Sequence, residues 1–519
     1  MRVLLIVVAV VIAVAIASVL AVFSYGQFAE RSLGPPSTAL PVADNTDLDR
    51  FATNVEAGKD GKTGLVMLAN GYEAFATRAL ASRAAGRSLD LMYYIWEEDL
   101  TGNLLAGEVL KAADRGVRVR MLLDDFTTNG SVAPYLALND HPNIEVRMFN
   151  PTRARENALR RGLEMFLRLF SNNHRMHNKA WIADARVAIV GGRNIGDDYF
   201  DATLLGNFSD LDLAVFGPAV AGAETIFDEY WNSRVVLPIT ALARAHQTPR
   251  LDLFREEIAK VEASEPAKPY LERVQERVSL MTSLAGPNAI HWSESAEIHA
   301  DPPQKALGEN RDKWLIYTVA KAIDAATRSV EITAPYFVPA EYGTNGLVDL
   351  AKKGVSVSVL TNSLAATDAF PAGFSGYAVY REALLKGGVK LYEQRPQKQP
   401  GYTVLLGASK LALHTKAFTV DDDTGFIGSF NFDPRSAELN TEMGVLFHDT
   451  ELIAQVRKLF ADQSARTNAF TVTLDDKGQM RWEGDVDDTA EVFDHDPETS
   501  PFRRFFTWFL SKLPIEYFL

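Results

Sequence analysis

The stretches MHNKAWIAD (Met176–Asp184) and LHTKAFTVD (Leu413–Asp421) contain one pattern twice. Each has His, any residue, Lys, four residues and Asp, and the two copies lie 237 positions apart (414 − 177). A second match follows each copy at the same offset, GGRN at 191–194 and GSFN at 428–431. Because repeated spacing on this scale indicates duplication of a whole structural unit, we interpret the chain as two related halves.

The similarity extends outward from the two motifs with small gaps. SLDLMYYIW from Ser88 matches SVEITAPYF from Ser329, and RGVRVRMLLDD from Arg115 matches KGVSVSVLTNS from Lys353. Downstream, we align SDLDLAVFG, from residue 209, with LNTEMGVLF, from residue 439, which pairs Asp212 with Glu442. Each half is therefore expected to read strand, helix, strand and then a hairpin that carries the motif.

This element order predicts the fold class. Strand–helix–strand units favour parallel pairing, so we expect an α/β protein of two tandem domains with mixed sheets flanked by helices, related by a pseudo-twofold axis. The expected divisions are an N-terminal apolar segment (1–25), a first domain (26–235), a linker of helices and loops (236–310), a second domain (311–470) and a C-terminal hairpin, acidic stretch and aromatic tail (471–519).

Composition excludes some classes of site. The chain has 519 residues, 47% of them apolar, which is enough for two full cores. Cys is absent, so there is no disulfide, thiolate metal site, Cys nucleophile or lipidated Cys anchor. The net charge of −14 argues against a general nucleic-acid binder, which normally carries a basic surface.

The N-terminus predicts export of the protein body. Residues 3–22 form an uncharged apolar run that is long enough to cross a bilayer as a helix. A cleaved signal peptide is the alternative, with AIA at 15–17 as its cleavage site, but the run is longer than a usual signal sequence. We favour a retained transmembrane anchor with the body of the protein on the outer side of the membrane, although few flanking charges define the orientation.

Each motif supplies half of a reaction centre. His and Lys two apart on a strand share one face, where an imidazole beside a fixed positive charge suits a phosphate group. Two copies brought together would let one imidazole attack phosphorus while the other protonates the leaving alkoxide. Charge in the transition state would be stabilised by two lysines and two asparagines, and two carboxylates would orient the imidazoles: Lys179, Lys416, Asn194, Asn431, Asp212 and Glu442. No metal or cofactor is required by this chemistry.

Simpler interpretations fit the two motifs less well. One HxKxxxxD pattern is weak, because a lone His on a strand is usually just packed or solvated, but two copies in register with matching Gly-x-x-Asn segments are not expected by chance. GGRNIG, from Gly191, also suggests a dinucleotide loop, yet it lacks the glycine spacing and the acidic partner of that motif.

These residues resemble the phospholipase D superfamily, whose HKD motif is HxKxxxxD followed by Gly-[Gly/Ser]-x-Asn. The resemblance covers residues 82–446, includes both motifs without departure, and is strongest to bacterial cardiolipin synthases through RMHNKAWIADARVAIVGGRNIGDDYF, LTNSLAATD and FIGSFNFDPRSAELNTEMG. It implies that His177 forms a phosphohistidine and that His414 acts as general acid and then base. It also implies that Lys179, Lys416, Asn194 and Asn431 hold the phosphoryl oxygens, and that Asp184 and Asp421 are structural.

Two further segments suggest contact with lipid. Residues 152–175 combine arginines with Leu and Phe in a pattern typical of a basic amphipathic helix on an anionic membrane, although a helix packed on the core would look similar. The tail PFRRFFTWFLSKLPIEYFL, from Pro501, combines aromatic and basic residues, which fits either the bilayer interface or docking into the core.

The sequence therefore predicts a membrane phosphatidyltransferase that makes cardiolipin from phosphatidylglycerol and a second phospholipid. Either phosphatidylglycerol or phosphatidylethanolamine fits as the donor, and one chain already contains both half-sites, so the pattern does not fix an oligomeric state. A phospholipase D that transfers to water uses the same intermediate and stays a rival. An HKD nuclease fits the charge and the apolar segments poorly, and a non-enzymatic scaffold fits poorly with two complete motifs.

Overall fold

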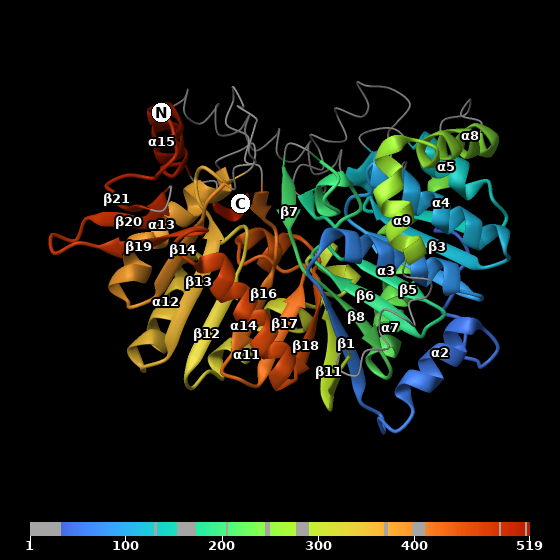
Figure 1. Cartoon of the computed structure of the whole chain (residues 1–519), viewed down its shortest axis with the longest axis horizontal. Helices are drawn as coiled ribbons and strands as arrows, with labels where there is room; N and C mark the ends of the chain where they lie inside the picture. The colour runs from blue at the N-terminus through green and yellow to red at the C-terminus, as the bar shows by residue number, and fades with distance from the viewer. Residues whose placement is uncertain are drawn as a thin grey trace, which may run out of the picture.

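A computed structural model describes residues 33–128, 132–152, 173–203, 206–243, 250–276, 290–367, 372–396, 411–486, 489–513 and 516–518. Two α/β halves lie side by side, the N-terminal half blue to green and the C-terminal half yellow to red (Figure 1). The expected N-terminal anchor and most of the expected basic helix, residues 153–172, lie outside the described residues. No helix in the described ranges is long and apolar enough to cross a membrane.

The first half is built on a mixed sheet that has nine strands within the described ranges. Its strands in spatial order are β10 (His291–Ser293), β1 (Thr63–Leu68), β8 (Asp212–Phe216), β6 (Val187–Gly191), β5 (Ala180–Ala183), β2 (Ser88–Tyr93), β3 (Arg118–Asp124), β4 (Ile144–Phe149) and β9 (Val236–Pro238). Among the described strands of this sheet, only the β2–β3 and β3–β4 pairs are parallel. The expected hairpin is the β5–β6 pair, which turns at Asp184–Arg186.

The second sheet repeats this order and has ten strands within the described ranges. They are β11 (Ser295–Ala300), β18 (Met443–His448), β17 (Thr424–Gly428), β16 (Ala417–Val420), β12 (Ser329–Thr333), β13 (Ser356–Asn362), β14 (Lys390–Gln394), β19 (Ala469–Leu474), β20 (Met480–Val486) and β21 (Thr489–Phe493). The run β8-β6-β5-β2-β3-β4 thus corresponds strand by strand to β18-β17-β16-β12-β13-β14. The predicted mixed α/β class with duplicated halves is confirmed by this arrangement.

Helices cover the sheets and bury their apolar faces. Those of the first half are α2 (Asp47–Glu56), α3 (Gly71–Ala84), α4 (Leu100–Asp114), α5 (Ala133–Asn139), α7 (Ala219–Trp231), α8 (Leu251–Glu262) and α9 (Lys268–Glu276). Those of the second half are α11 (Leu315–Asp324), α12 (Ala340–Lys352), α13 (Ala372–Lys386), α14 (Thr450–Ser464) and α15 (Pro501–Leu510). Each half has its own buried hydrophobic cluster. Burial of such apolar faces is the main favourable contribution to folding.

A third core joins the two halves. Phe227 and Trp231 of α7 pack in one buried cluster with Phe447 of β18 and Leu452 of α14. Near the motifs the halves also pair directly, since the short strand β7 (Asn207–Ser209) runs parallel to β15 (Leu411–Leu413). These contacts hold the two motif-bearing hairpins in a fixed relation.

The segment expected as a linker of helices and loops does more than connect. In residues 236–310, β9 and β10 extend the first sheet and β11 pairs with β18 of the second. Helices α8 and α9 of the same segment pack on the outer side of the first half. The charged residues and prolines that suggested loops belong to the exposed faces of these helices. The strands of the segment are too short to show a sequence period.

Candidate active site at the junction of the two halves

Each motif aspartate follows the strand, β5 or β16, that begins after its motif lysine, and its side chain anchors a neighbouring strand. The motif histidines and lysines precede these strands and do not lie on them, contrary to expectation. Asp184 accepts hydrogen bonds from the backbone N–H groups of Gly86, Arg87 and Ser88 at 2.8–2.9 Å. Asp421 does the same for Thr327, Arg328 and Ser329 at 2.7–3.0 Å. Both aspartates have a positive φ of 51°, which Asp tolerates better than most residues. Both side chains therefore tie their hairpins to the start of the neighbouring strand.

Each motif histidine is fixed by the opposite half. The backbone N–H of His177 donates to the carbonyl of Thr441, and that of His414 donates to the carbonyl of Ser209, both at 2.8 Å. The two bonds are equivalent under the pseudo-twofold relation. A single centre is thus formed from both halves, with the histidines buried within it.

Glu442 contacts the first histidine, so its predicted orienting role has the required geometry. Its Oε2 lies 2.8 Å from Nδ1 of His177, and the carbonyl of Ser429 lies 3.1 Å from the same nitrogen. Glu442 also accepts from the hydroxyls of Ser429 at 2.5 Å and Ser436 at 2.8 Å. A proton held on Nδ1 by these acceptors leaves the lone pair of Nε2 available for attack.

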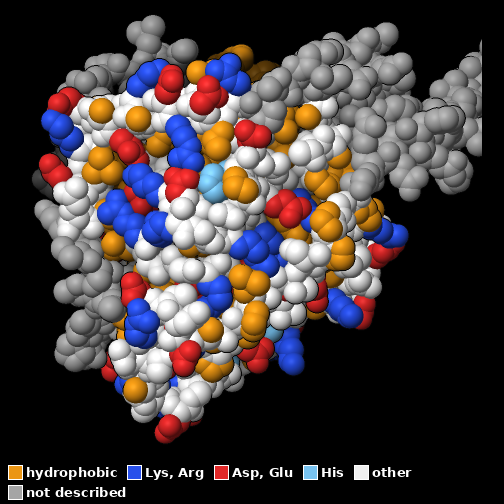
Figure 2. All heavy atoms as spheres, turned by 90° about the vertical axis from the view of Figure 1, so that its right-hand side faces the viewer, with side chains coloured by type: hydrophobic (Ala, Val, Ile, Leu, Met, Phe, Trp, Pro, Cys, Tyr) orange, Lys and Arg blue, Asp and Glu red, His pale blue; other side chains and the backbone are white. Residues whose placement is uncertain are grey.

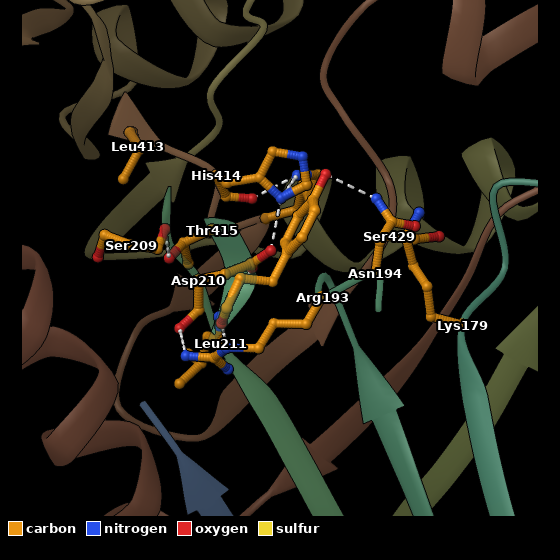
Figure 3. A network of polar contacts seen from close by, with 12 residues as sticks. Lys179, Arg193, Asn194, Ser209, Asp210, Leu211, Leu413, His414, Thr415 and Ser429 are labelled. Atoms are coloured by element: carbon orange, nitrogen blue, oxygen red, sulfur yellow. Dashed lines mark hydrogen bonds and ion pairs between the residues drawn. The ribbon is translucent and has the colours of Figure 1, made fainter. Parts of the chain in front are cut away.

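The predicted partner of the second histidine is wrong. Asp212 does not contact His414 but binds Arg78 at 2.9 Å and the backbone N–H of Arg193 at 3.2 Å. Asp210 contacts Nδ1 of His414 instead, with its Oδ2 at 2.5 Å, as Figure 3 shows. Asp210 was not among the residues predicted from the sequence.

The error is a two-residue slip in the alignment of the halves. Gly191 pairs with Asp212, whereas the equivalent Gly428 pairs with Gly444, so Asp212 corresponds to Gly444 and Asp210 to Glu442. A slip of two keeps each side chain on the same face of a strand, so alternation of apolar residues does not reveal it. The matching pairs Ser209/Thr441, Asp210/Glu442 and Leu211/Met443 are the signal that could have identified Asp210.

The two lysines line the same centre. Nζ of Lys179 donates to the carbonyl of His177 at 2.6 Å and lies 5.5 Å from the ring centre of Tyr94. Nζ of Lys416 lies 2.8 Å from Nδ1 of His414 and also contacts its carbonyl. Both lysines are almost fully buried, which places two ammonium groups where an anionic ligand would neutralise them.

The two asparagines flank the histidines but differ in their bonding. Nδ2 of Asn194 donates to the hydroxyl of Tyr199 at 2.8 Å, and its Oδ1 accepts from the N–H of Ile95 at 3.2 Å. Figure 3 shows Asn194 and Lys179 across from His414. Oδ1 of Asn431 is buried without a hydrogen-bond partner among the described residues, so this amide can turn toward an incoming group.

Burial controls the charge state of the centre. It lowers the pKa of His177 to about 4 and, with Lys416 acting in the same direction, lowers the pKa of His414 to about 3. Lys179 and Lys416 each affect the histidine of the other half, which shows that the four groups form one electrostatic unit. Burial also lowers the pKa of Lys179 well below its ordinary value. A phosphodiester anion would reverse these shifts by restoring the balance of charge.

Aromatic side chains shape the walls of the centre. The ring of Tyr94 lies edge-on to His177 with 5.1 Å between ring centres. Tyr199 and Phe208 lie 5.2 and 5.0 Å from the ring of His414. No group of three or more acidic or His side chains in the described ranges could hold a metal ion.

The family model described as "Cardiolipin synthase, PLD-like domain" matches residues 80–231 and 319–463, the two halves that form this centre. The chain belongs to this phospholipase D-like family. It is 36% identical over 466 residues to cardiolipin synthase C of Escherichia coli K12, covering 88% of this chain and 97% of the relative. The family predicted from the two HKD motifs is therefore confirmed, and the predicted enzyme class, a phospholipid phosphatidyltransferase, agrees with it.

More distant proteins are also similar to most of this chain. Cardiolipin synthase A of Pseudomonas putida GB-1 is 28% identical over 408 residues, covering 78% of this chain and 69% of that protein. The crystal structure of phosphatidylserine synthase from Haemophilus influenzae superposes with a TM-score of 0.56 at 15% identity, covering 90% of this chain and all of that one. The latter similarity supports the two-half fold.

Proposed function

We propose that this enzyme makes cardiolipin by transferring a phosphatidyl group to the hydroxyl of phosphatidylglycerol. The observation that carries the proposal is the crossed arrangement of the centre. Each imidazole comes from one half, and its carboxylate, Glu442 or Asp210, comes from the other. Such a centre can present two histidines to opposite sides of one phosphorus atom, which in-line displacement with a covalent intermediate requires.

In the first step, Nε2 of His177 attacks the phosphorus of the donor lipid. The phosphorus–nitrogen bond forms while the bond to the head-group oxygen breaks, and His414 gives that oxygen its proton. His177 is assigned as nucleophile by the order of the family, and its Nδ1 contact with Glu442 supports this assignment by directing the Nε2 lone pair outward. The ammonium of Lys416 beside His414 makes its imidazolium a stronger acid.

In the second step, the roles of the imidazoles reverse. His414 takes the proton from the primary hydroxyl of phosphatidylglycerol, whose oxygen attacks phosphorus and releases His177. Lys179, Lys416, Asn194 and Asn431 are placed to stabilise the charge on the equatorial phosphoryl oxygens in both steps. Atoms balance, because the donor head group leaves with one proton and the acceptor loses one.

The exposed side of helix α15 supports contact with a membrane. Phe502, Phe505 and Trp508 are 75%, 60% and 56% exposed, while Thr507 and Leu510 on the opposite side are buried. One side of the tail helix is buried and the other is exposed, which supports contact of the exposed side with lipid. Aromatic residues beside Arg504 and Lys512 suit the bilayer interface, where a lipid substrate would be collected. We place the enzyme at the bacterial inner membrane, with its catalytic body on the outer side.

The outer face of the first half does not suggest nucleic acid as a substrate (Figure 2). Figure 2 shows Lys and Arg side chains interspersed with Asp and Glu over the outer face of the first half. A surface that follows a phosphate backbone instead needs a continuous basic stripe. Together with the net charge of −14, this favours a lipid phosphodiester over the nuclease alternative.

Product analysis in vesicles tests the proposal. We expect cardiolipin from vesicles of phosphatidylglycerol, and an isotope label on either phosphatidylglycerol or phosphatidylethanolamine in mixed vesicles identifies the donor by mass spectrometry. The His177→Ala and His414→Ala variants should each lose at least about 10³-fold in rate, because each removes a covalent or proton-transfer step. Full activity in both variants would refute the mechanism, and phosphatidic acid as the main product would identify a hydrolase.

A further inference from the structure

The carboxylate that orients His177 is itself held by a buried ion pair from the segment between the halves. Asp301, just after β11, and Lys305 have completely buried side chains, and Nζ of Lys305 lies 2.9 Å from Oδ2 of Asp301. Neither residue belongs to a motif, and neither contacts an imidazole. A buried charge pair is costly to form, so its position beside a catalytic carboxylate calls for a physical role.

Asp301 forms two hydrogen bonds with the backbone of Glu442, one as donor and one as acceptor. Its N–H donates to the carbonyl of Glu442 at 2.9 Å, and its Oδ2 accepts from the N–H of Glu442 at 2.9 Å. Its Oδ1 accepts from the N–H of Leu315 at 2.8 Å, and its carbonyl accepts from the hydroxyl of Tyr230 at 2.7 Å. Glu442 is therefore tied to α11 in the second half and to α7 in the first.

Lys305 supports the side-chain carboxylate of Glu442 through Ser436. Its Nζ donates to the carbonyl of Ser436 at 2.8 Å, and the hydroxyl of Ser436 donates to Oε1 of Glu442 at 2.8 Å. Oε2 then remains for Ser429 and His177. Both oxygens of Glu442 are thus fixed, and one path of hydrogen bonds runs from Lys305 to Nδ1 of His177.

The first half supports its carboxylate in another way. Arg193 donates to the carbonyl of Asp210 at 2.5 Å and to those of Leu68 and Ala69 at 2.7 Å, and the N–H of Leu211 donates to Oδ1 of Asp210 at 2.8 Å. Asp301 and Lys305 contribute nothing to this arrangement among the contacts of the described residues. Their path therefore leads to one imidazole of the two.

We propose that Asp301 and Lys305 are positioning residues for His177 alone, acting through Ser436 and Glu442. They set the direction of its Nε2 lone pair and so control formation of the phosphorus–nitrogen bond. They leave proton transfer by His414 unchanged. The inference rests on the proposed function, in which His177 is the nucleophile.

The test uses phosphatidyl-p-nitrophenol in detergent micelles beside phosphatidylglycerol vesicles. p-Nitrophenolate leaves without needing a proton, so a defect in the general acid is relieved by this donor and a defect in the nucleophile is not. The amount released in the first turnover counts competent sites, and its rate constant reports bond formation. A purely structural defect lowers the amount, whereas a positioning defect lowers the rate constant at full amount.

We expect Ser436→Ala and the double variant Asp301→Asn/Lys305→Met to release the full first-turnover amount with a rate constant about 10- to 100-fold lower for both donors, because small misplacements of a reacting group have effects of this size. Arg120→Met is the matched control: it removes one member of a similarly buried pair with Asp90 that does not lead to the centre. This control should retain the wild-type rate constant even if fewer molecules are competent.

Two results would overturn the inference while leaving the proposed function intact. One is a wild-type rate constant in both Ser436→Ala and the double variant, and the other is a defect that the p-nitrophenyl donor relieves. Ser436→Ala removes one hydroxyl, which donates to Glu442 and accepts from the N–H of Asn431 at 3.3 Å, and it keeps the inference testable if the double variant does not fold. Wild-type enzyme that releases no p-nitrophenol would overturn the proposed function and this inference together.

Discussion

The two halves share a backbone plan but support their carboxylates with different chemistry. The second half has a long carboxylate, Glu442, held by the hydroxyl of Ser429, while the first has the shorter Asp210 next to Gly192. A Cβ on Gly192 would lie 2.2 Å from Oδ1 of Asp210, so no side chain fits there. The half with the shorter carboxylate thus needs a glycine, and the half with the longer one uses a serine as an extra donor.

The difference continues behind the carboxylates. In the first half Asp212 forms a fully buried charged network with Arg78 and Arg193. The equivalent positions of Asp212 and Arg193 in the second half are Gly444 and Phe430, and the ring of Phe426 fills the space beside Gly444. Duplication therefore preserved the geometry of the two histidines while the buried support became ionic in one half and aromatic in the other. We infer that a different buried environment sets the properties of each imidazole.

The largest expected effect comes from neutralising each carboxylate. Glu442→Gln should lower activity about 10³-fold, because an amide can donate to Nδ1 of His177 and so favour the tautomer that protonates Nε2. Asp210→Asn should lower activity with phosphatidylglycerol by about 10²-fold or more, because the imidazolium of His414 loses its counter-charge. The measurements are the steady-state rate with phosphatidylglycerol and the first-turnover rate constant with phosphatidyl-p-nitrophenol, which reports the first step alone.

The two donor lipids distinguish a defect at His414 from a defect at His177. Asp210→Asn should recover to within about 10-fold of wild type with the p-nitrophenyl donor, whereas Glu442→Gln should stay impaired. Recovery of Glu442→Gln and not of Asp210→Asn would exchange the roles of His177 and His414. Equal behaviour of the two variants would contradict separate tuning.

A smaller effect is expected from changing the residue beside each carboxylate. Gly192→Ala should lower the rate about 10²-fold, because the new methyl group displaces Asp210, and Ser429→Gly should lower it about 10-fold through loss of one hydrogen bond to Glu442. Gly346→Ala in α12 is the control, since a Cβ there meets nothing within 4 Å. A larger loss in Ser429→Gly than in Gly192→Ala would reverse the inferred order of crowding in the two halves.

Sequence was sufficient for those features that depend on fixed spacing. His177 and Lys179 directly precede β5, and His414 and Lys416 directly precede β16, so the arrangement within each motif is set within a few residues. The duplicated spacing then predicted that the two motifs meet at one centre. The strand–helix–strand patterns likewise predicted the parallel β2–β3 and β12–β13 pairs. Roles in catalysis for these residues stay predictions until variants are measured.

Features that depend on contacts between distant segments were not predictable in this way. Asp210 was missed because a two-residue slip leaves the pattern of a strand unchanged. Asp301 and Lys305 gave no signal, since a charged pair in a Pro-rich segment looks like exposed surface and only the tertiary fold buries it. The same holds for Arg193, whose counterpart in the second motif is a phenylalanine.

The smallest effect on catalysis is expected at the two motif aspartates, where the halves differ only slightly. Asp184→Asn and Asp421→Asn should each lower the free energy of unfolding by about 2 to 4 kcal/mol, because an amide replaces a carboxylate that accepts several backbone bonds. Rates per folded molecule should stay within about 3-fold of wild type, since neither side chain contacts an imidazole. Denaturant unfolding followed by circular dichroism measures the stability, and a loss of rate as large as that of Glu442→Gln would place these residues in the chemistry.

The loss of unfolding free energy in Asp421→Asn should depend on pH. Burial raises the pKa of Asp421, but the backbone N–H groups of Ser329, Thr327 and Arg328 and the hydroxyl of Thr327 outweigh it and lower the pKa from 3.8 to about 2. A carboxyl whose folded pKa is depressed contributes its full stability above the unfolded pKa and loses it as the pH falls toward the folded value. The difference in unfolding free energy between wild type and Asp421→Asn should therefore be constant from about pH 8 to about pH 5 and shrink below about pH 4. A difference that already shrinks between about pH 7 and about pH 5 would show that another group, and not this carboxylate, carries the stabilisation.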